Sequence, residues 1–453
     1  MFSKDAMVML DPQGDFFDDG VARLTLEDIP AEIRESLNLA SFQSAQGQGS
    51  FPGTVIRLPL RTEHPGLKIS TKTISCQEIE QNFQTFARTE MDICLLFLSS
   101  LQSVEFWVIR EGETTPSRIA LSSITPVANA QPDNVALTRR VETTIQPNPS
   151  YGRDWLIRWH SVPQFQDKLS VRVGCDVKST MGSEKLVATV ALAIQTGALS
   201  EGRCVPGKLF TYLPLPSDTN YPCNIHAPFA LTVDRQTLRN EKEEGLIKGT
   251  ADQYVFLSVG TLTYTDPYFS IRVEWNRYLF DTVVPEAWTK LLLDLSKLNL
   301  SPFSVWPSKQ HVSIGCSYWR SVPAETIRWI MDKRATVWPV RGPSTPPTYH
   351  RYDDVLIAPP TITTALLDVF ASVGLTVTQP PQEVYDLVYS VDHHRILTPE
   401  LAHAAILVRP NGFHIAIFCT NKPSSGSGIG STRDSRQKQT TPFTGLPPLY
   451  EQG

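Results

Sequence analysis

The apolar residues of this chain fall into short, strand-sized segments that turn residues separate. Val187–Ile194 is among the longest of them, whereas a membrane-spanning helix needs about 20 apolar residues. Between residues 154 and 214 such segments follow one another closely. They are Trp155–His160, Leu169–Val173, Leu186–Ile194 and Lys208–Leu213. This spacing predicts a meander of antiparallel strands in the middle of the chain.

Helical spacing dominates on either side of this run of strands. In residues 268–300, apolar residues recur at the three- and four-residue spacing of a helix, and Pro285 is expected to divide the segment. Residues 76–92 carry a similar apolar stripe, with Ser75 or Thr73 as the N-cap. The middle of the chain is therefore predicted to combine a sheet with helices.

The remaining segments are shorter or less regular. Ser103–Ile109 is expected to be a strand, whereas residues 115–150 are polar and irregular, with a single expected strand near Arg140–Thr144. Beyond Thr336, strands and helices alternate, which predicts a small α/β unit. Its expected elements are Val355–Ile357, Thr361–Val373, Thr376–Thr378 and Gln382–Val391.

The composition argues against several classes of protein. A net charge of -5 and a pI of about 6.0 give no basic footprint for nucleic acid. The 7 cysteines include no Cys-x-x-Cys pair, which argues against a zinc site or a disulfide framework. The N-terminus lacks the apolar core of a signal peptide. The protein is therefore expected in the cytoplasm, or also in the nucleus, with neither nucleic acid nor a membrane as a partner.

No local motif specifies a catalytic or metal site. The sequence has no Gly-x-Ser-x-Gly elbow and no glycine-rich phosphate loop. His393, His394 and His403 are the only clustered histidines. Their spacing does not place ligands on one helix face, so no metal is predicted. The tryptophans from Trp275 to Trp338 could form a partner-binding surface, but a place in the core or at a subdomain junction is favoured.

Several stretches of the chain, taken in order, resemble the sacsin family. They are Phe51–Thr62, Leu95–Glu105, Gly207–Pro216, Cys223–Leu238 and the Trp275–Asn276 pair of the expected helix. The likeness covers residues 1–340 and, more weakly, residues 350–420. Each stretch alone is a generic apolar segment, and their common order carries the resemblance.

In that family, which is related to the 90-kDa heat-shock chaperones, the nucleotide-binding subdomain has the Bergerat fold. Its hallmarks are a helix with a catalytic Glu and a metal-anchoring Asn, an Asp-x-Gly-x-Gly loop and a glycine-rich lid. The nearest runs here, Asp11–Gly14 and Asp18–Gly20, do not stand in the required order. The resemblance implies that the hallmarks would precede Met1. No cofactor is therefore expected in this chain, and ATP with Mg²⁺ only if an upstream half is present.

The resemblance implies two binding positions. Thr54 matches a position whose hydroxyl helps to bind adenine, and Arg235 matches a middle-domain arginine that reaches the γ-phosphate. An arginine suits this role because its planar fork carries a fixed charge to phosphate oxygens. The alternatives are that Thr54 only enters a strand, and that Arg235 pairs with an acid such as Asp234 or Glu241.

The expected fold class is α+β. We predict a C-terminal remnant of a Bergerat subdomain (1–62), a chaperone middle-like sheet-and-helix domain (63–340), a small α/β domain (341–420) and a disordered Gly/Ser-rich tail (421–453).

Three functions remain open at this stage. The leading hypothesis is a sacsin-like chaperone or scaffold module in protein quality control. It would bind protein clients or other chaperones and would not hydrolyse ATP alone. The second hypothesis is a fragment of a larger ATP-dependent chaperone-like ATPase, and the third is an unrelated hydrolase. The sequence leaves the oligomeric state open.

Overall fold

The computed structural model describes most of the chain between residues 73 and 402 and two short strands before it. The described ranges are 7–10, 21–24, 73–110, 116–126, 136–174, 176–178, 187–200, 205–219, 221–232, 235–239, 267–308, 318–340, 346–372 and 374–402. The fold is a mixed α+β arrangement, as predicted. Thr54, His403 and the expected tail 421–453 lie outside the described residues, and the domain boundaries stay predictions.

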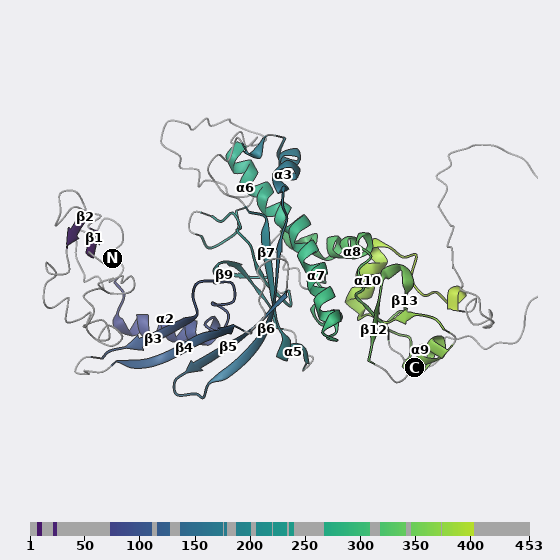
Figure 1. The fold of residues 1–453 in the computed structure, drawn as a ribbon, viewed down its shortest axis with the longest axis horizontal. Coiled ribbons are helices and arrows are strands. Elements are labelled where there is room, and N and C mark those ends of the chain that lie inside the picture. The colour runs from purple at the N-terminus through teal and green to yellow at the C-terminus, as the bar shows by residue number, and fades with distance from the viewer. Residues whose placement is uncertain are drawn as a thin grey trace, which may run out of the picture. The chain divides into compact units, whose positions relative to one another are not determined.

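The largest described sheet has eight strands in the order β3-β4-β5-β6-β7-β10-β8-β9 (Figure 1). The strands are β3 (Ser103–Val108), β4 (Ser117–Pro126), β5 (Ala136–Ile145), β6 (Tyr151–Ser161), β7 (Thr189–Gln195), β8 (Lys208–Thr211), β9 (Leu213–Asp218) and β10 (Asn224–His226). Strands β3 to β7 form an antiparallel meander, but only β6 and β7 belong to the segment 154–214 where a meander was predicted. The meander ends there, because β10 inserts between β7 and β8 and pairs with β8 in parallel.

Two predictions for this region are wrong. Residues 115–150 contain two long strands, β4 and β5, instead of one short strand. Their alternation is masked by polar residues on the buried side, where Ser122 and Thr143 are opposite each other and hydrogen-bonded at 3.2 Å. The expected strand Leu169–Val173 belongs to helix α3 (Phe165–Val173). Phe165 and Leu169 are buried four residues apart, which is helical spacing, and Val171 is exposed.

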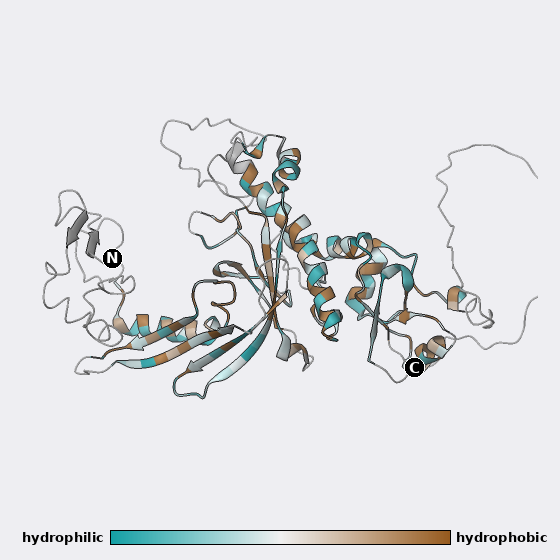
Figure 2. Cartoon of the chain, viewed as in Figure 1, coloured by the Kyte–Doolittle hydropathy of each residue, from teal (hydrophilic) through white to brown (hydrophobic). Residues whose placement is uncertain are grey.

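The long helical segment runs through Pro285 instead of breaking at it. Helix α6 (Pro267–Tyr278) passes through a π-helical stretch (Leu279–Val283) into α7 (Val284–Lys297). Pro285 lies in the first turn of α7, directly after the π-helical stretch, and the chain stays helical there although proline has no N–H to donate. The next helix is α8 (Val322–Asp332). Figure 2 shows apolar and polar positions alternating along α7, as one buried face requires.

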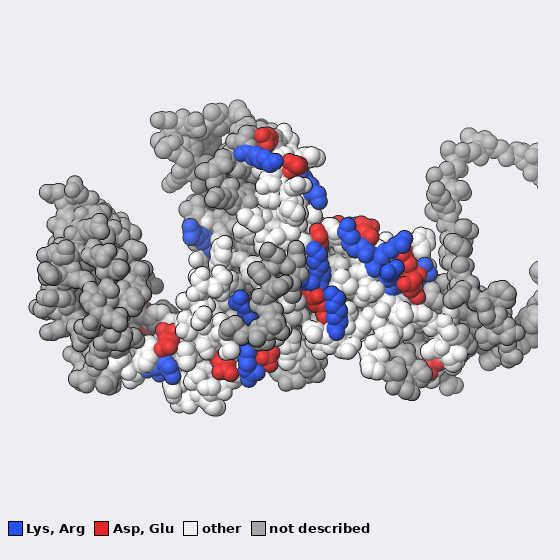
Figure 3. All heavy atoms as spheres, viewed as in Figure 1, with Lys and Arg blue, Asp and Glu red and all other residues white. Residues whose placement is uncertain are grey.

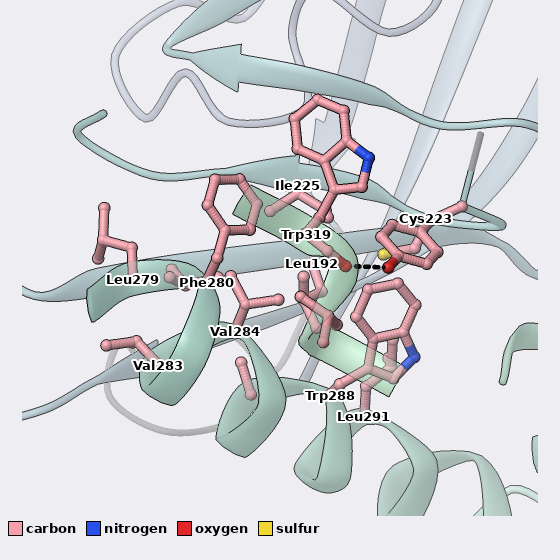
Figure 4. Close-up of a cluster of buried hydrophobic side chains, with 14 of the residues drawn as sticks. Leu192, Cys223, Ile225, Leu279, Phe280, Val283, Val284, Trp288, Leu291 and Trp319 are labelled. Atoms are coloured by element: carbon pink, nitrogen blue, oxygen red, sulfur yellow. Dashed lines mark hydrogen bonds between the residues drawn. The ribbon is translucent and has the colours of Figure 1, made fainter. Parts of the chain in front are cut away.

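Helix α7 packs on β6 and β7, and this contact forms the main core. Leu192, Ile225 and Trp288 interdigitate there with Phe280 and Trp319 (Figure 4). The Tyr221 hydroxyl donates to the Trp319 carbonyl oxygen at 2.6 Å. The predicted core role is confirmed for the buried tryptophans, which are Trp275, Trp288, Trp306, Trp319 and Trp338.

The shorter elements also match several predictions. Helix α2 (Cys76–Thr89) begins at Ser75, which forms a capping box with Glu78. Strand β13 pairs in parallel with β14, and helices α9 and α10 follow these strands in the predicted order. The remaining bounds are β1 (Met7–Leu10), β2 (Val21–Leu24), α5 (Thr196–Ser200), β11 (Trp338–Val340), β12 (Thr348–His350), β13 (Leu356–Ile357), α9 (Thr364–Ser372), β14 (Val377–Thr378) and α10 (Gln382–Val391). Among the described helices, none is long and apolar enough to cross a bilayer.

Gly207 occupies a position that no side chain could share. A Cβ atom there would lie 1.9 Å from the Cys223 carbonyl oxygen. The backbone N–H of Gly207 donates to Tyr221, and its carbonyl oxygen accepts from Thr219. The glycine at the start of the Gly207–Pro216 stretch therefore allows the chain before β8 to approach the chain before β10.

A buried ion pair joins the sheet to α7. Arg158 on β6 lies 2.7 Å (Nε) from Asp294 Oδ2, and its Nη2 donates to Oδ1 at 2.9 Å. The two side chains are only 8% and 10% exposed. Burial raises the pKa of Asp294, although Arg158 opposes this shift. Such a pair orients two elements, because either charge alone would be costly in the interior.

We predict that Arg158→Met lowers the free energy of unfolding by about 4 kcal/mol, because it removes the buried partner of the Asp294 carboxylate and leaves only the exposed Lys297 at 3.8 Å. The double variant Arg158→Met with Asp294→Leu should recover most of this loss. Arg140→Met, in the exposed pair with Asp154, serves as control and should cost less than about 1 kcal/mol. Urea unfolding measures all three. Equal losses for the single and double variants would contradict the prediction.

A second buried polar group, His226 at the end of β10, lies among aromatic rings. Its ring stacks on Phe97 at 5.1 Å and meets Trp159 edge-on at 5.5 Å. The side chain is 4% exposed. Burial lowers the pKa of His226 from 6.5 to about 4, because a charged imidazole would lose its hydration. Histidine is therefore neutral here at physiological pH.

Between pH 6.5 and about pH 4, His226 binds a proton in the unfolded chain but not in the folded chain. Stability from His226 is therefore complete above pH 6.5 and falls as the pH drops toward about 4. We expect a loss of about 2 kcal/mol between about pH 7 and about pH 5. His226→Gln should reduce this pH dependence, and His394→Gln at an exposed site should not. Urea unfolding at both pH values measures the free energy of unfolding. If His226→Gln loses as much stability between the two pH values as the unaltered protein, His226 is not the group responsible.

Candidate functional site

A groove of about 720 Å³ opens where three chain segments meet. The end of β8, Tyr212 and the start of β9 supply residues 211–215. Lining residues between 228 and 239 follow β10, and α6 supplies Arg272 and Trp275. These segments belong to the stretches Gly207–Pro216 and Cys223–Leu238 and to the helix of Trp275 and Asn276. The sequence stretches that carried the resemblance therefore converge on one site.

Arg235 lies at the tip of a tight hairpin. Leu231 and Leu238 form an antiparallel bridge at its base. The backbone N–H of Arg235 donates to the Thr232 carbonyl oxygen at 2.9 Å, and Arg235 adopts a left-handed φ of 56°. The N–H of Thr237 donates to the Thr232 hydroxyl at 3.2 Å. These bonds close the turn and present the exposed Arg235 side chain at the groove.

Asn276 on α6 holds this hairpin in place. Its side chain is fully buried, at 0% exposure. Its Oδ1 accepts from the Ala230 N–H at 2.9 Å, and its Nδ2 donates to the carbonyl oxygens of Ala230 and Arg239 at 2.8 and 3.1 Å. The neighbouring Trp275 donates from Nε1 to Pro228 at 2.8 Å. One turn of α6 therefore fixes both strands of the hairpin that carries Arg235.

The charged residues in the described lining of the groove are arginines. Its described lining contains Arg235, Arg239 and Arg272 and no aspartate or glutamate. Arg239 and Arg272 already take part in interactions. Figure 3 shows blue and red groups lying side by side on the face in view. The exposed guanidinium of Arg235 is of a type that can donate charge-assisted hydrogen bonds to an anion.

An exposed apolar rim borders the arginines. Tyr212 and Leu213 are 58% and 55% exposed. Tyr212 has a left-handed φ of 66°, and its backbone N–H donates to His226 Nδ1 at 3.2 Å. The neutral imidazole accepts this bond, so burial of His226 helps to hold the rim in its turn. The groove thus combines fixed positive charge with accessible apolar surface.

The sequence predicted only part of this site. It singled out Arg235 but not Arg239, Arg272 or Tyr212. No local sequence pattern marks Arg239 or Arg272. They reach the same groove only through the folding of the hairpin and the position of α6. Asp234 and Glu241, the predicted alternative partners of Arg235, lie outside the described residues, so that alternative remains open.

The other ionisable groups give no second site among the described residues. His160 contacts Lys290 at 2.9 Å and Glu286 at 3.4 Å between β6 and α7. Burial raises the pKa of Glu286, but His160 and Lys290 outweigh it, so the net shift is downward. Burial raises the pKa of the Cys94 thiol to about 11, which makes it a poor nucleophile. In the described part of the chain, no group of three or more His, Cys, Asp or Glu could hold a metal ion.

We predict that Asn276→Ala destabilises the protein by about 2 kcal/mol, because the Ala230 N–H loses its partner and the carbonyl oxygens of Ala230 and Arg239 each lose one of two donors. Asn276→Asp keeps the acceptor but loses the donors, and should be intermediate. Arg277→Gln on the same helix is the control. Hydrogen–deuterium exchange should rise selectively in residues 228–239. Uniform exchange across the chain in Asn276→Ala would contradict a local role.

Comparison with known proteins gives two matches. Residues 1–120 match the family model described as Sacsin domain. The chain is also 27% identical to sacsin from Homo sapiens over 372 residues, which covers 73% of this chain and 7% of sacsin. It therefore corresponds to a small part of that relative's length. No solved structure matches the chain.

The matched domain includes the Phe51–Thr62 and Leu95–Glu105 stretches, and the wider similarity extends over most of the chain. The resemblance predicted from the order of the five sequence stretches is confirmed: the chain carries a sacsin-domain match at its N-terminal end and is distantly similar to human sacsin over most of its length.

Proposed function

We propose that this chain is a sacsin-like chaperone or scaffold module that binds protein clients or other chaperones in protein quality control. We propose further that residues 1–62 correspond to the C-terminal end of a Bergerat nucleotide-binding subdomain. In this view the chain acts by binding and does not hydrolyse ATP by itself, since its sequence lacks the hallmark motifs of that subdomain.

The observation that carries the proposal is the preorganised groove around Arg235. Arginine and tyrosine are the residue types most enriched where binding energy concentrates in protein interfaces. Here Arg235, Arg272 and Tyr212 line one groove. The hairpin is already fixed by Asn276, so binding would require little further ordering of the loop.

A second candidate is a fragment of a larger ATP-dependent chaperone. The exposed position of Arg235 at the tip of a hydrogen-bonded hairpin supports it. A guanidinium held in this way could meet a phosphate that another part of the assembly supplies. In that case Thr54 and Arg235 would contact the nucleotide, with Mg²⁺, only in the presence of an upstream nucleotide-binding half.

A hydrolase receives less support from the described side chains. A nucleophile needs an adjacent base that is itself oriented. His160 faces Lys290 and Glu286, and His226 accepts from a backbone N–H. Neither arrangement places a serine or cysteine against a histidine in the described residues.

We predict that the full 453-residue chain suppresses the aggregation of a chemically unfolded reporter enzyme diluted into buffer. Light scattering should fall at roughly equal amounts of chain and reporter, because a stoichiometric binder covers exposed apolar surface. Size-exclusion chromatography should show a complex of the two. An unrelated globular protein of similar size is the control.

ATP with Mg²⁺ should change neither readout, and calorimetry should give no saturable ATP signal. Suppression that requires ATP would favour the second candidate instead. If neither suppression nor a complex is observed, the proposed function is wrong.

A further inference from the structure

We propose that strand β3 is an interface with a second copy of this chain, and that the two β3 strands pair in antiparallel fashion around Phe106. Strand β3 lies at the opposite edge of the sheet from β9 and the groove, so this inference goes beyond the proposed function. It rests on the main-chain edge of β3, on the order of its residues and on the apolar side chains beside it.

The outer edge of β3 has main-chain groups directed away from the sheet. Among the described strands, only β4 pairs with β3, which begins the strand order of the sheet (Figure 1). The main-chain groups of successive residues point to alternate sides of a strand. The Gln102 carbonyl oxygen accepts from the Ile124 N–H on the β4 side at 2.9 Å. The main-chain groups of Ser103, Glu105 and Trp107 therefore point outward.

The strand itself is regular along this edge. Side-chain exposure alternates without a break from Ser103 to Val108. The register with β4 shifts between Phe106 and Trp107, but the unpaired residue is Ile119 on β4. The irregularity therefore leaves the outward N–H and C=O groups of β3 in a continuous row.

The two edges of the sheet differ in their protection against pairing. Strand β9 contains Pro214 and Pro216, and proline interrupts the row of N–H donors along an edge. Strand β3 contains neither proline nor lysine, and its one charged residue is Glu105. An edge of β-branched and aromatic residues without proline is the type that accepts another strand.

The order of residues in β3 is complementary to itself in the antiparallel direction. With Phe106 opposite its equivalent, Val104 lies opposite Val108. In the same register Glu105 lies opposite Trp107, and the outward main-chain groups of these two residues face each other. Centring the pair on Glu105 would instead place two carboxylates opposite each other, which is unfavourable. This self-complementarity favours a second copy over an unrelated extended segment.

Apolar side chains beside this edge are incompletely covered. Phe83 on α2 is 44% exposed, and its ring lies 4.8 Å from that of Phe106. Leu101, Trp107 and Ile109 are each 43–44% exposed at or beside β3. Pairing would bring such side chains from two copies together, and removing apolar surface from water is favourable.

The side chains of the strand keep their present contacts in this arrangement. Glu105 accepts from Trp107 Nε1 at 2.9 Å and lies 3.9 Å from Arg118. Pairing uses main-chain groups, so neither contact has to break. The contact is small, and we expect a reversible dimer with a Kd of about 10 μM.

The test is sedimentation equilibrium of the full chain from about 1 to about 100 μM, a range that brackets the expected Kd. The unaltered chain should pass reversibly from monomer to dimer. A two-fold interface is closed, so no larger species should form.

Two substitutions at one position test the register. Trp107→Glu places like charges opposite Glu105 twice in the dimer and should raise the Kd about tenfold relative to Trp107→Lys, which places opposite charges there. Both remove the same aromatic ring from an exposed site, so circular dichroism should show the same fold for each. Tyr389→Glu, at the exposed Tyr389 of α10, is the control and should leave the Kd unchanged.

Hydrogen–deuterium exchange provides a second readout. At high concentration, exchange in residues 103–109 should slow relative to the dilute chain, and exchange in α10 should not change. A chain that stays monomeric over the whole range would overturn the proposal. If residues 103–109 are nevertheless protected in that monomer, another segment of the same chain occupies the edge.

Equal weakening by Trp107→Glu and Trp107→Lys would also overturn the pairing around Phe106. So would assembly beyond the dimer, which would require a different surface. Protection of residues 103–109 by the unfolded reporter, without dimer formation, would assign the edge to clients instead. The proposed function is tested separately, because capture of the reporter does not require the chain to dimerise.

Discussion

The packing of α7 on β6 and β7 is the contact on which the rest of the structure depends. Trp288 and Leu291 from the helix meet Leu192 and Ile225 from the sheet in one continuous core. Burying large apolar side chains supplies most of the favourable free energy of such a fold. Helix α6 continues directly into this helix through the π-helical stretch, so the position of α7 also determines where Asn276 and Arg272 lie.

Buried polar groups then give this apolar core its specific geometry. Arg158 with Asp294 sets the orientation of α7 on the sheet, and Asn276 attaches the hairpin to α6. His226 accepts the Tyr212 N–H among aromatic rings. Each group is satisfied in only one arrangement, because a buried donor or acceptor without a partner is costly. The positions of the segments that line the groove therefore depend on these buried contacts in the core.

The similarity to sacsin and the groove concern different parts of the chain. The matched Sacsin domain covers residues 1–120, whereas the described groove lies between residues 211 and 275. The 27% identity to human sacsin extends over most of the chain. The Gly207–Pro216 and Cys223–Leu238 stretches are short. Two of their features have a physical reason: the backbone at Gly207 lies against Cys223, and Asn276 holds the backbone of Ala230.

The sequence by itself determined where most helices and the apolar strands lie, because periodicity, caps and proline act over a few residues. The N-cap Ser75 of α2 and the alternating elements from β13 to α10 follow from such local signals. It did not reveal β4 and indicated only the Arg140–Thr144 part of β5, because the buried faces of both strands carry polar residues, and it predicted a strand where α3 lies.

Only the tertiary structure decided that β10 inserts between β7 and β8 and that three arginines face one groove. These features arise from contacts between residues far apart in the chain. A single sequence carries no local signal for strand order, because strand pairing depends on which faces can be buried together.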